Sequence, residues 1–446
     1  MSENNEPTRR GFLKSTAAVG AAGLAATQGF ASSAPATSDA AADYLRQYAV
    51  PRETIDRFLD PTARVWAKYD PTYGYLLRDA FLRDGVDGAR TLGRYTQDGP
   101  RRQVNFTDEP CRINTYGDSF TQGHQVSDGE TWQEVLAAHF CEPIRNYGIG
   151  GFGVYQAYRR MLENEATENG ADHLVLNIWG DDHHRSVYSC RWLSFPTSIL
   201  SGMTGAMYHA NPWVHARLDP NTDELLEKPN ACPNEESLYG LCDGDWLVDT
   251  FANDPIIHVL IAIHHGKVSD RAVLEQVASQ AGVETLDFSS EDATRVTGRQ
   301  ILNTYAVKVG TKIIDAANAF ATANGKRLFV LLSHPSGSVW RHCAKKTASD
   351  AGEHDWHPEW FRQHLRDTGV PFVDTVEAHV EDFQRFSGTA REYVDRYYIG
   401  HYTPTGNHFF AYAVKDQLAQ WLDPPPPAYA DNGHETLIRF EGYLPE

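Results

Sequence analysis

The sequence predicts an α/β fold, a three-layer α/β/α sandwich around a mainly parallel sheet. Two stretches, residues 173–179 and 327–333, are almost continuously apolar, as strands are when a parallel sheet is buried on both faces. From residue 111 onward, strand-like runs alternate with helix-like runs, which is the order typical of α/β proteins. We also expect an N-terminal extension before this part of the chain and a long insertion within it.

Residues 1–36 have the composition of a targeting signal. Arg9 and Arg10 precede Gly-Phe-Leu-Lys, and an apolar run rich in alanine and glycine extends to Ala26. This pattern resembles a twin-arginine export signal, with small-residue cleavage sites at Ala31 and at residues 34–36. The alternative is an uncleaved anchor, although the run is short for a bilayer span of about 20 residues. We expect the twin-arginine export machinery as a partner, a periplasmic or extracellular location, and no stable membrane association after cleavage.

The charge of the chain excludes some classes of partner. The formal net charge is -19 at pH 7, so the surface should repel nucleic acid and anionic membranes. The 6 cysteines are few for 446 residues, and we do not expect core stability to depend on disulfides. A local bond between Cys232 and Cys242 remains an open alternative.

Residues 37–108 form the predicted N-terminal accessory region, which is rich in aromatic residues and proline and should pack against the main sheet. The main domain is expected over residues 109–422. Its first strand ends near Tyr116, and a helix should run from Ser127 to Phe140, because Ser127 and Glu130 have the spacing of a capping box. A second strand over 143–147, a glycine cluster over 148–153, a helix over 154–165 and the strand over 173–179 follow in order.

Residues 190–290 interrupt this alternation with scattered proline, asparagine and glycine, so we predict an insertion that forms a substrate lid or a specificity subdomain. A long helix over 299–323 should stop at Asn324-Gly325, and a strand over 327–333 follows. A helix over 358–365 and a strand over 371–374 come next. Thr403 and Pro404 can start a last helix that ends at Leu422, and residues 423–446 form a C-terminal tail.

Four of the predicted strand-to-helix loops carry residues suited to acyl transfer. Ser119 follows the first strand on a glycine-assisted turn, where its hydroxyl would enter the crevice at the carboxyl ends of the strands. The glycine cluster follows the second strand, Gly180-Asp181-Asp182 follows the third, and His401 precedes the last helix. Such loops could bring a nucleophile, a base and oxyanion donors to one point.

At these residues the chain resembles the SGNH, or GDSL-type, hydrolases, a family of α/β/α esterases and lipases with a flavodoxin-like sheet. By this resemblance Ser119 is the nucleophile, His401 is the base, and the N–H groups of Ser119 and Gly151 form the oxyanion hole. Asp181 stands where the family has an oxyanion-hole asparagine, so it could donate a hydrogen bond only if protonated.

The family's triad acid precedes the histidine by three residues, and Tyr398 occupies that position in this chain. The acid is therefore unassigned. Asp395 is the nearest carboxylate upstream of His401, and Asp374 ends the last strand. A Ser-His dyad oriented by a backbone carbonyl needs no third side chain.

Other patterns carry weaker hypotheses. Residues 181–184 could bind a metal, but their spacing is not that of a metal site, and His183, His184 and Arg185 better suit a substrate pocket for a polar or anionic group. His334 also follows a strand and is an alternative base. Residues 148–153 fit a dinucleotide-binding glycine pattern, although the expected acidic residue is too far away.

The sequence therefore predicts an exported serine ester hydrolase that removes acyl groups, for example acetyl groups, from a carbohydrate or another polar ester. We expect neither a cofactor nor a metal. Two alternatives remain open, a non-hydrolytic carbohydrate-binding protein with the same fold and an O-acyltransferase that uses the same serine.

Overall fold

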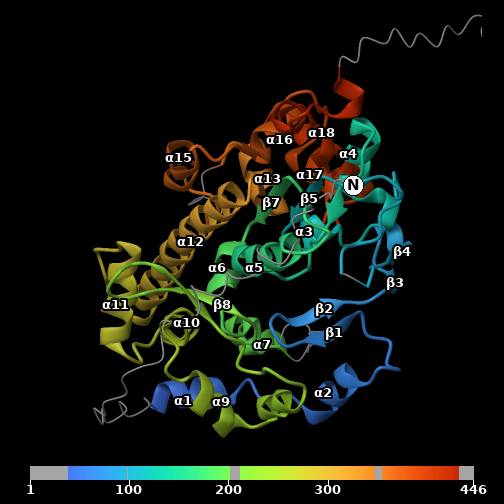
Figure 1. Cartoon of the computed structure of the whole chain (residues 1–446). Coiled ribbons are helices and arrows are strands. Elements are labelled where there is room, and N and C mark those ends of the chain that lie inside the picture. Colours follow the sequence, from blue (N-terminus) through green and yellow to red (C-terminus); the bar gives the residue numbers. More distant parts are fainter. Residues whose placement is uncertain (1–38, 98, 201–210, 347–353, 431–446) are drawn as a thin grey trace, which may run out of the picture. The chain divides into compact units, whose positions relative to one another are not determined.

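A parallel sheet of five strands carries the fold in the computed structural model, which describes residues 39–97, 99–200, 211–346 and 354–430 (Figure 1). The signal predicted for residues 1–36 and the last part of the predicted tail, 431–446, lie outside the described residues. In chain order, the strands of the sheet are β5 (Ile113–Tyr116), β6 (Arg145–Asn146), β7 (His173–Trp179), β10 (Arg327–Ser333) and β11 (Phe372–Asp374).

The spatial order of these strands is β11-β10-β7-β5-β6, and every neighbouring pair is parallel. Counted along the chain, this is the flavodoxin-like order in which the second strand lies outside the first. From β5 the chain adds β6 on one side and then β7 on the other, so the strand order switches between β5 and β7. In such folds, ligands bind beyond the carboxyl ends of the strands at this switch point. The predicted parallel sheet is confirmed.

Side chains alternate between two cores along each strand. On β7, Leu174 and Leu176 belong to one buried cluster, whereas Val175 belongs to the other. The first cluster packs under the helices α5 (Val154–Glu165), α6 (Asp182–Val187) and α12 (Glu291–Ala323). The second packs under α4 (Trp132–Phe140), α13 (Ser336–Cys343), α17 (Ala390–Tyr397) and α18 (Pro404–Trp421), and α16 (Thr375–Phe383) also contacts β10 on this side. Helices therefore cover both faces of the sheet, as Figure 1 shows.

Two predicted helices begin at other residues. The Glu130 carboxylate does accept a bond from the Ser127 N–H, but this cap belongs to a short turn, η3 (Asp128–Glu130), and Thr131 caps α4 separately. The helix predicted over 299–323 begins at Glu291, because the Ser290 hydroxyl accepts a bond from the Ala293 N–H. Its first turns contain β-branched residues and Gly298, which are poor helix formers and led the sequence prediction to start the helix too late. In the structure Gly298 packs closely on Ala262 and lies within the helix.

The accessory region contains two helices and two hairpins. They are α1 (Asp39–Arg46), α2 (Arg52–Leu59), the pair β1 (Ala67–Asp70) and β2 (Gly74–Leu77), and the pair β3 (Ala80–Arg83) and β4 (Arg90–Gly93) joined through η2 (Val86–Gly88). The Tyr75 hydroxyl on β2 donates to the Gly150 carbonyl, 2.8 Å away. This region therefore contacts a loop at the carboxyl edge of the sheet.

The insertion is mainly helical in its described part. It contains η4 (Arg191–Ser194), α7 (Thr197–Leu200), the hairpin of β8 (His215–Leu218) and β9 (Leu225–Lys228), η5 (Glu236–Cys242), α9 (Gly244–Phe251), α10 (Pro255–His265) and α11 (Arg271–Ala281). Cys232 and Cys242 are both free thiols, so the disulfide left open by the sequence is not formed. Two further elements, α15 (Glu359–Asp367) and η6 (Pro427–Tyr429), complete the described chain.

No single helix among the described residues has both the length and the apolar composition needed to cross a bilayer. In the described ranges, α9 and α10 meet these criteria when taken together, and the two helices are bent by 118° at their junction.

Candidate active site

The serine lies at the first residue of a short helix, α3 (Ser119–Gln122), which starts immediately after β5. Gly117 makes the turn possible, because its φ is +153° and a Cβ there would lie 2.2 Å from Thr121 Oγ1 and 2.7 Å from the Asn177 carbonyl oxygen. Asp118 caps the helix by accepting a bond from the Phe120 N–H at 2.9 Å. The backbone therefore fixes Ser119 at the carboxyl end of β5, where the strand order switches.

Ser119 and His401 form a hydrogen-bonded pair although 282 positions separate them in the chain. His401 Nε2 lies 2.8 Å from Ser119 Oγ, and His401 Nδ1 lies 3.1 Å from Gln125 Oε1. An amide oxygen only accepts, so the imidazole proton is on Nδ1 and the lone pair of Nε2 faces the serine hydroxyl. The geometry is that of a nucleophile and a base oriented by a third side chain.

The third side chain is Gln125, which the sequence did not single out. Its Oε1 also accepts the His401 backbone N–H at 2.9 Å, and its Nε2 donates to the Asp84 carbonyl at 2.8 Å. Gln125 has a φ of +69°, a strained value for a residue other than glycine. A glutamine in a polar loop carries no local sequence signal, because its role depends on a histidine 276 positions away.

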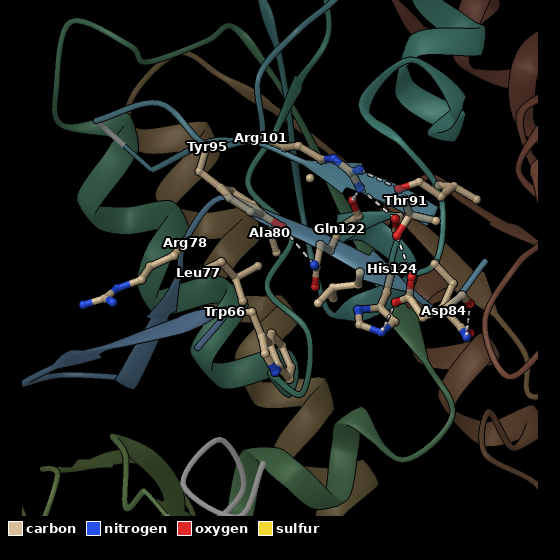
Figure 2. A pocket seen from close by; sticks show the side chains of 15 residues that line it. Trp66, Leu77, Arg78, Ala80, Asp84, Thr91, Tyr95, Arg101, Gln122 and His124 are labelled. Carbon is tan, nitrogen blue, oxygen red and sulfur yellow. Dashed lines mark hydrogen bonds and ion pairs between the residues drawn. The ribbon is translucent and has the colours of Figure 1, made fainter. Parts of the chain in front are cut away.

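A buried arginine from the accessory region holds the loop that carries Gln125. The Arg101 guanidinium donates to the carbonyls of residues 122, 123 and 126 at 2.7 Å each, and to the Asp128 carboxylate at 2.9 Å. Figure 2 shows this arginine beside Gln122 and Tyr95, with His124 and Asp84 at the far side of a cavity of about 30 Å³. The accessory region therefore supports the loop next to the Ser119–His401 pair.

The surroundings of His401 favour its neutral form. Burial, the neighbouring His124 ring, and the guanidinium groups of Arg185 and Arg191 all lower the pKa of His401 well below its ordinary value. The centre of the His124 ring lies 4.6 Å from that of His401. A neutral imidazole is the form that can accept a proton from a serine hydroxyl.

The two predicted oxyanion donors, those of Ser119 and Gly151, are backbone N–H groups without an acceptor in the described part of the chain. The loop around Gly151 is fixed, since Gly150 donates to the Gln122 amide oxygen at 2.9 Å and accepts from Tyr75. Gly148 packs against α3, the helix that contains Gln122, and a Cβ on Gly148 would lie 2.2 Å from the Gln122 backbone nitrogen.

Asp181 lies in surroundings that favour its ionised form. Its carboxylate pairs with Arg185, which also lies 2.9 Å from Asp182 and 3.5 Å from Asp118. Burial raises the pKa of Asp181, but Arg185 and Arg191 outweigh burial and leave it below its ordinary value. The pairing with Arg185 favours the ionised form of Asp181 over the protonated form that an oxyanion donor needs, and the side chain accepts from Arg185.

The other candidates for the triad acid and the base lie elsewhere. Asp395 forms an exposed ion pair with Arg391, and Asp374 binds His334 at 2.6 Å. His334 is thus engaged with Asp374, and no bond joins it to Ser119. The Tyr398 hydroxyl lies 3.3 Å from His379 Nε2 rather than next to His401.

A cavity of about 640 Å³ lies beyond β7, with Trp179 and Pro335 among the residues that line it. His184 and Arg185 line it, as predicted, but His183 does not, because its ring is fully buried between His357 and Phe361. Within the described residues, no group of three or more His, Cys, Asp or Glu side chains could hold a metal ion.

Comparison with known protein families identifies residues 6–26 as a TAT (twin-arginine translocation) pathway signal sequence. The predicted signal is thereby confirmed, and it indicates export through the twin-arginine machinery to the periplasm or the extracellular space. A search of curated proteins found no match to the chain. The resemblance to SGNH hydrolases stays a prediction.

Proposed function

We propose that this protein is an exported serine ester hydrolase of the SGNH type, which removes acyl groups such as acetyl from a carbohydrate or another polar ester. The observation that carries the proposal is the contact of 2.8 Å between Ser119 Oγ and His401 Nε2, with Nδ1 of the same ring bonded to Gln125. The flavodoxin-like strand order and the position of Ser119 directly after β5 support the SGNH assignment.

In the first half of the reaction, Ser119 Oγ attacks the ester carbonyl carbon while His401 Nε2 takes the hydroxyl proton. The carbonyl oxygen becomes an oxyanion, which the N–H groups of Ser119 and Gly151 stabilise. The bond between carbon and the alcohol oxygen then breaks, and His401 returns the proton to the leaving alcohol. An acyl group remains on Ser119.

In the second half, a water molecule attacks the acyl carbon and gives a proton to His401. The bond to Ser119 Oγ breaks, His401 returns the proton to the serine, and the carboxylic acid leaves. Gln125 keeps the imidazole in the required tautomer throughout, but as a neutral amide it stabilises the imidazolium less than a carboxylate does.

The test is covalent labelling of the mature protein with a fluorophosphonate, together with an assay of acetate release from an acetylated sugar. We expect one serine adduct per chain and acetate release, both absent in Ser119→Ala. If neither the adduct nor acetate release occurs at any pH, the enzymatic proposal is wrong and a binding role remains. An acyltransferase would form the same adduct but pass the acyl group to an added sugar acceptor faster than to water.

A further inference from the structure

One buried arginine contacts the chain after each of three strands of the sheet. The guanidinium of Arg185, on α6, donates to the Phe152 carbonyl at 3.2 Å and to the Asp182 carboxylate at 2.9 Å, and it also pairs with Asp181. The Asp118 carboxylate lies 3.5 Å from its Nη1. These acceptors follow β5, β6 and β7, so a single side chain connects three segments at the carboxyl edge of the sheet.

Two of these segments carry the groups that the proposed reaction needs. Phe152 directly follows Gly151, whose N–H is a predicted oxyanion donor. Asp118 directly precedes Ser119, which supplies the nucleophile and the other donor. Asp118 Oδ1 caps α3, and its Oδ2 lies 3.4 Å from Ser119 Oγ. Arg185 therefore contacts the residue next to each of the two donors.

The backbone around Arg185 leaves little room for movement. A Cβ on Gly153 would lie 2.5 Å from both the Asp182 carbonyl oxygen and the Ser186 nitrogen, so the glycine cluster packs directly on α6. The guanidinium carbon lies 5.3 Å from the centre of the Trp179 ring, and a cation over an aromatic face is attracted to it. A shift of Arg185 would therefore be passed on to the loop that carries Gly151.

The positive charge of Arg185 is also needed in this place. The side chains of Asp118 and Asp182 are almost fully buried, whereas that of Asp181 is partly exposed. Burial raises the pKa of Asp118 and Asp182, and Arg185 opposes this rise. Three carboxylates without a cation would disfavour an oxyanion that forms beside them.

We infer that Arg185 is a positioning residue for the oxyanion hole, because it joins the segment that carries Ser119 to the loop that carries Gly151. The chain after β7 then contributes to the hole through an arginine that Asp181 holds, rather than through a side-chain donor at position 181. This inference rests on the proposed function for its link to catalysis, whereas the joining of the two segments needs no reaction.

The first test compares Arg185→Lys with Arg112→Lys in the mature protein. Lysine keeps the charge but has no planar fork, so we expect kcat to fall roughly 10- to 100-fold while KM changes little. Arg112 pairs with Glu142 and directly precedes β5, at the opposite edge of the sheet from Ser119, so Arg112→Lys should keep wild-type kcat. Rates are measured well below the melting temperature of each variant, so that lost stability alone cannot lower kcat.

A second variant covers the case in which the buried lysine prevents folding. Asp181→Ala removes one partner of the guanidinium at a partly exposed position, so it should fold and lower kcat by a smaller factor than Arg185→Lys. Wild-type kcat in a folded Arg185→Lys, or in Asp181→Ala if the lysine variant does not fold, would overturn the inference.

Amide hydrogen exchange tests the loop contact without catalysis. We expect peptides that cover residues 148–153 to exchange roughly tenfold faster in Arg185→Lys than in wild type, and at the wild-type rate in Arg112→Lys. Faster exchange supports the inference even if Ser119 forms no fluorophosphonate adduct, a result that would refute the proposed function alone. Wild-type exchange of this loop in Arg185→Lys would overturn the inference whether or not Ser119 reacts.

Discussion

At the scale of single residues, Gln125 is the most unusual feature of the site, because an amide stands where serine hydrolases commonly have a carboxylate. Gln125→Ala removes the acceptor for His401 Nδ1, so the ring can turn away from Ser119. We expect kcat to fall roughly 10- to 100-fold, the range for a misplaced catalytic group. KM should change little, and Gln363→Ala, an exposed glutamine on α15, should retain full activity.

Gln125→Glu distinguishes orientation from simple packing. A carboxylate at this position should raise the pKa of His401 and move the acid side of the pH profile upward while activity persists. A Glu variant with an unmoved pH profile, or an Ala variant with wild-type kcat, would show that Gln125 does not act on His401.

The lowered pKa of His401 leads to a second prediction at the residue scale, on how activity depends on pH. In the proposed mechanism the base works only when neutral, and the surroundings of His401 lower its pKa well below the ordinary value of 6.5. Since a lower pKa keeps the ring neutral to lower pH, kcat/KM should stay level from pH 8 down through 6.5 and decline only in more acidic solution. Rates measured across this range on an ester with no ionisable group test the prediction. A decline centred at or above pH 6.5 would contradict it.

At the scale of elements, the accessory region is expected to control the site through Arg101. Arg101→Lys keeps the charge, but an ammonium has three donors and cannot reproduce the fork that binds the carbonyls of residues 122, 123 and 126. Each acceptor left unpaired in the interior destabilises by about 1–3 kcal/mol. We expect a lower melting temperature and a lower kcat, because the loop also carries Gln125.

The neighbouring residue supplies the control for this prediction. Arg102 is exposed, so Arg102→Lys should change neither the melting temperature nor kcat. If Arg101→Lys lowers the melting temperature but leaves kcat unchanged, the arginine stabilises the fold without positioning the loop.

The elements also show how far the sequence could lead. The apolar runs of β7 and β10 and the glycine turn before Ser119 were visible locally, so the sheet and the position of Ser119 could be predicted, whereas His401 was indicated as its partner by the resemblance to SGNH hydrolases. Gln125 could not, because its contact with His401 depends on tertiary structure. The charge state of Asp181 also escaped prediction, because Arg185 one helical turn away controls it. The early start of α12 could not be predicted either, because Gly298 stays helical through its packing against Ala262.

At the scale of the whole molecule, the many buried histidines make stability depend on pH. Burial is the first cause that lowers the pKa of His173 and His357 to about 4, and of His215 and His379 to about 3. In the unfolded chain these rings titrate near pH 6.5. Below that pH the unfolded chain binds protons that the folded chain refuses, so the free energy of unfolding falls as the pH falls toward 4.

Each such ring contributes a slope of about 1.4 kcal/mol per pH unit, so the four rings together remove about 4–5 kcal/mol between pH 6 and pH 5. Asp118 and Asp182, which have a raised pKa, take up protons in the folded state and offset part of this loss. Urea denaturation at pH 7, 6 and 5 measures the slope. His173→Gln should reduce it by about one histidine's share, whereas His408→Gln, at an exposed position, should not change it. An unfolding free energy that is equal at pH 7 and pH 5 would mean that the buried rings accept protons without unfolding.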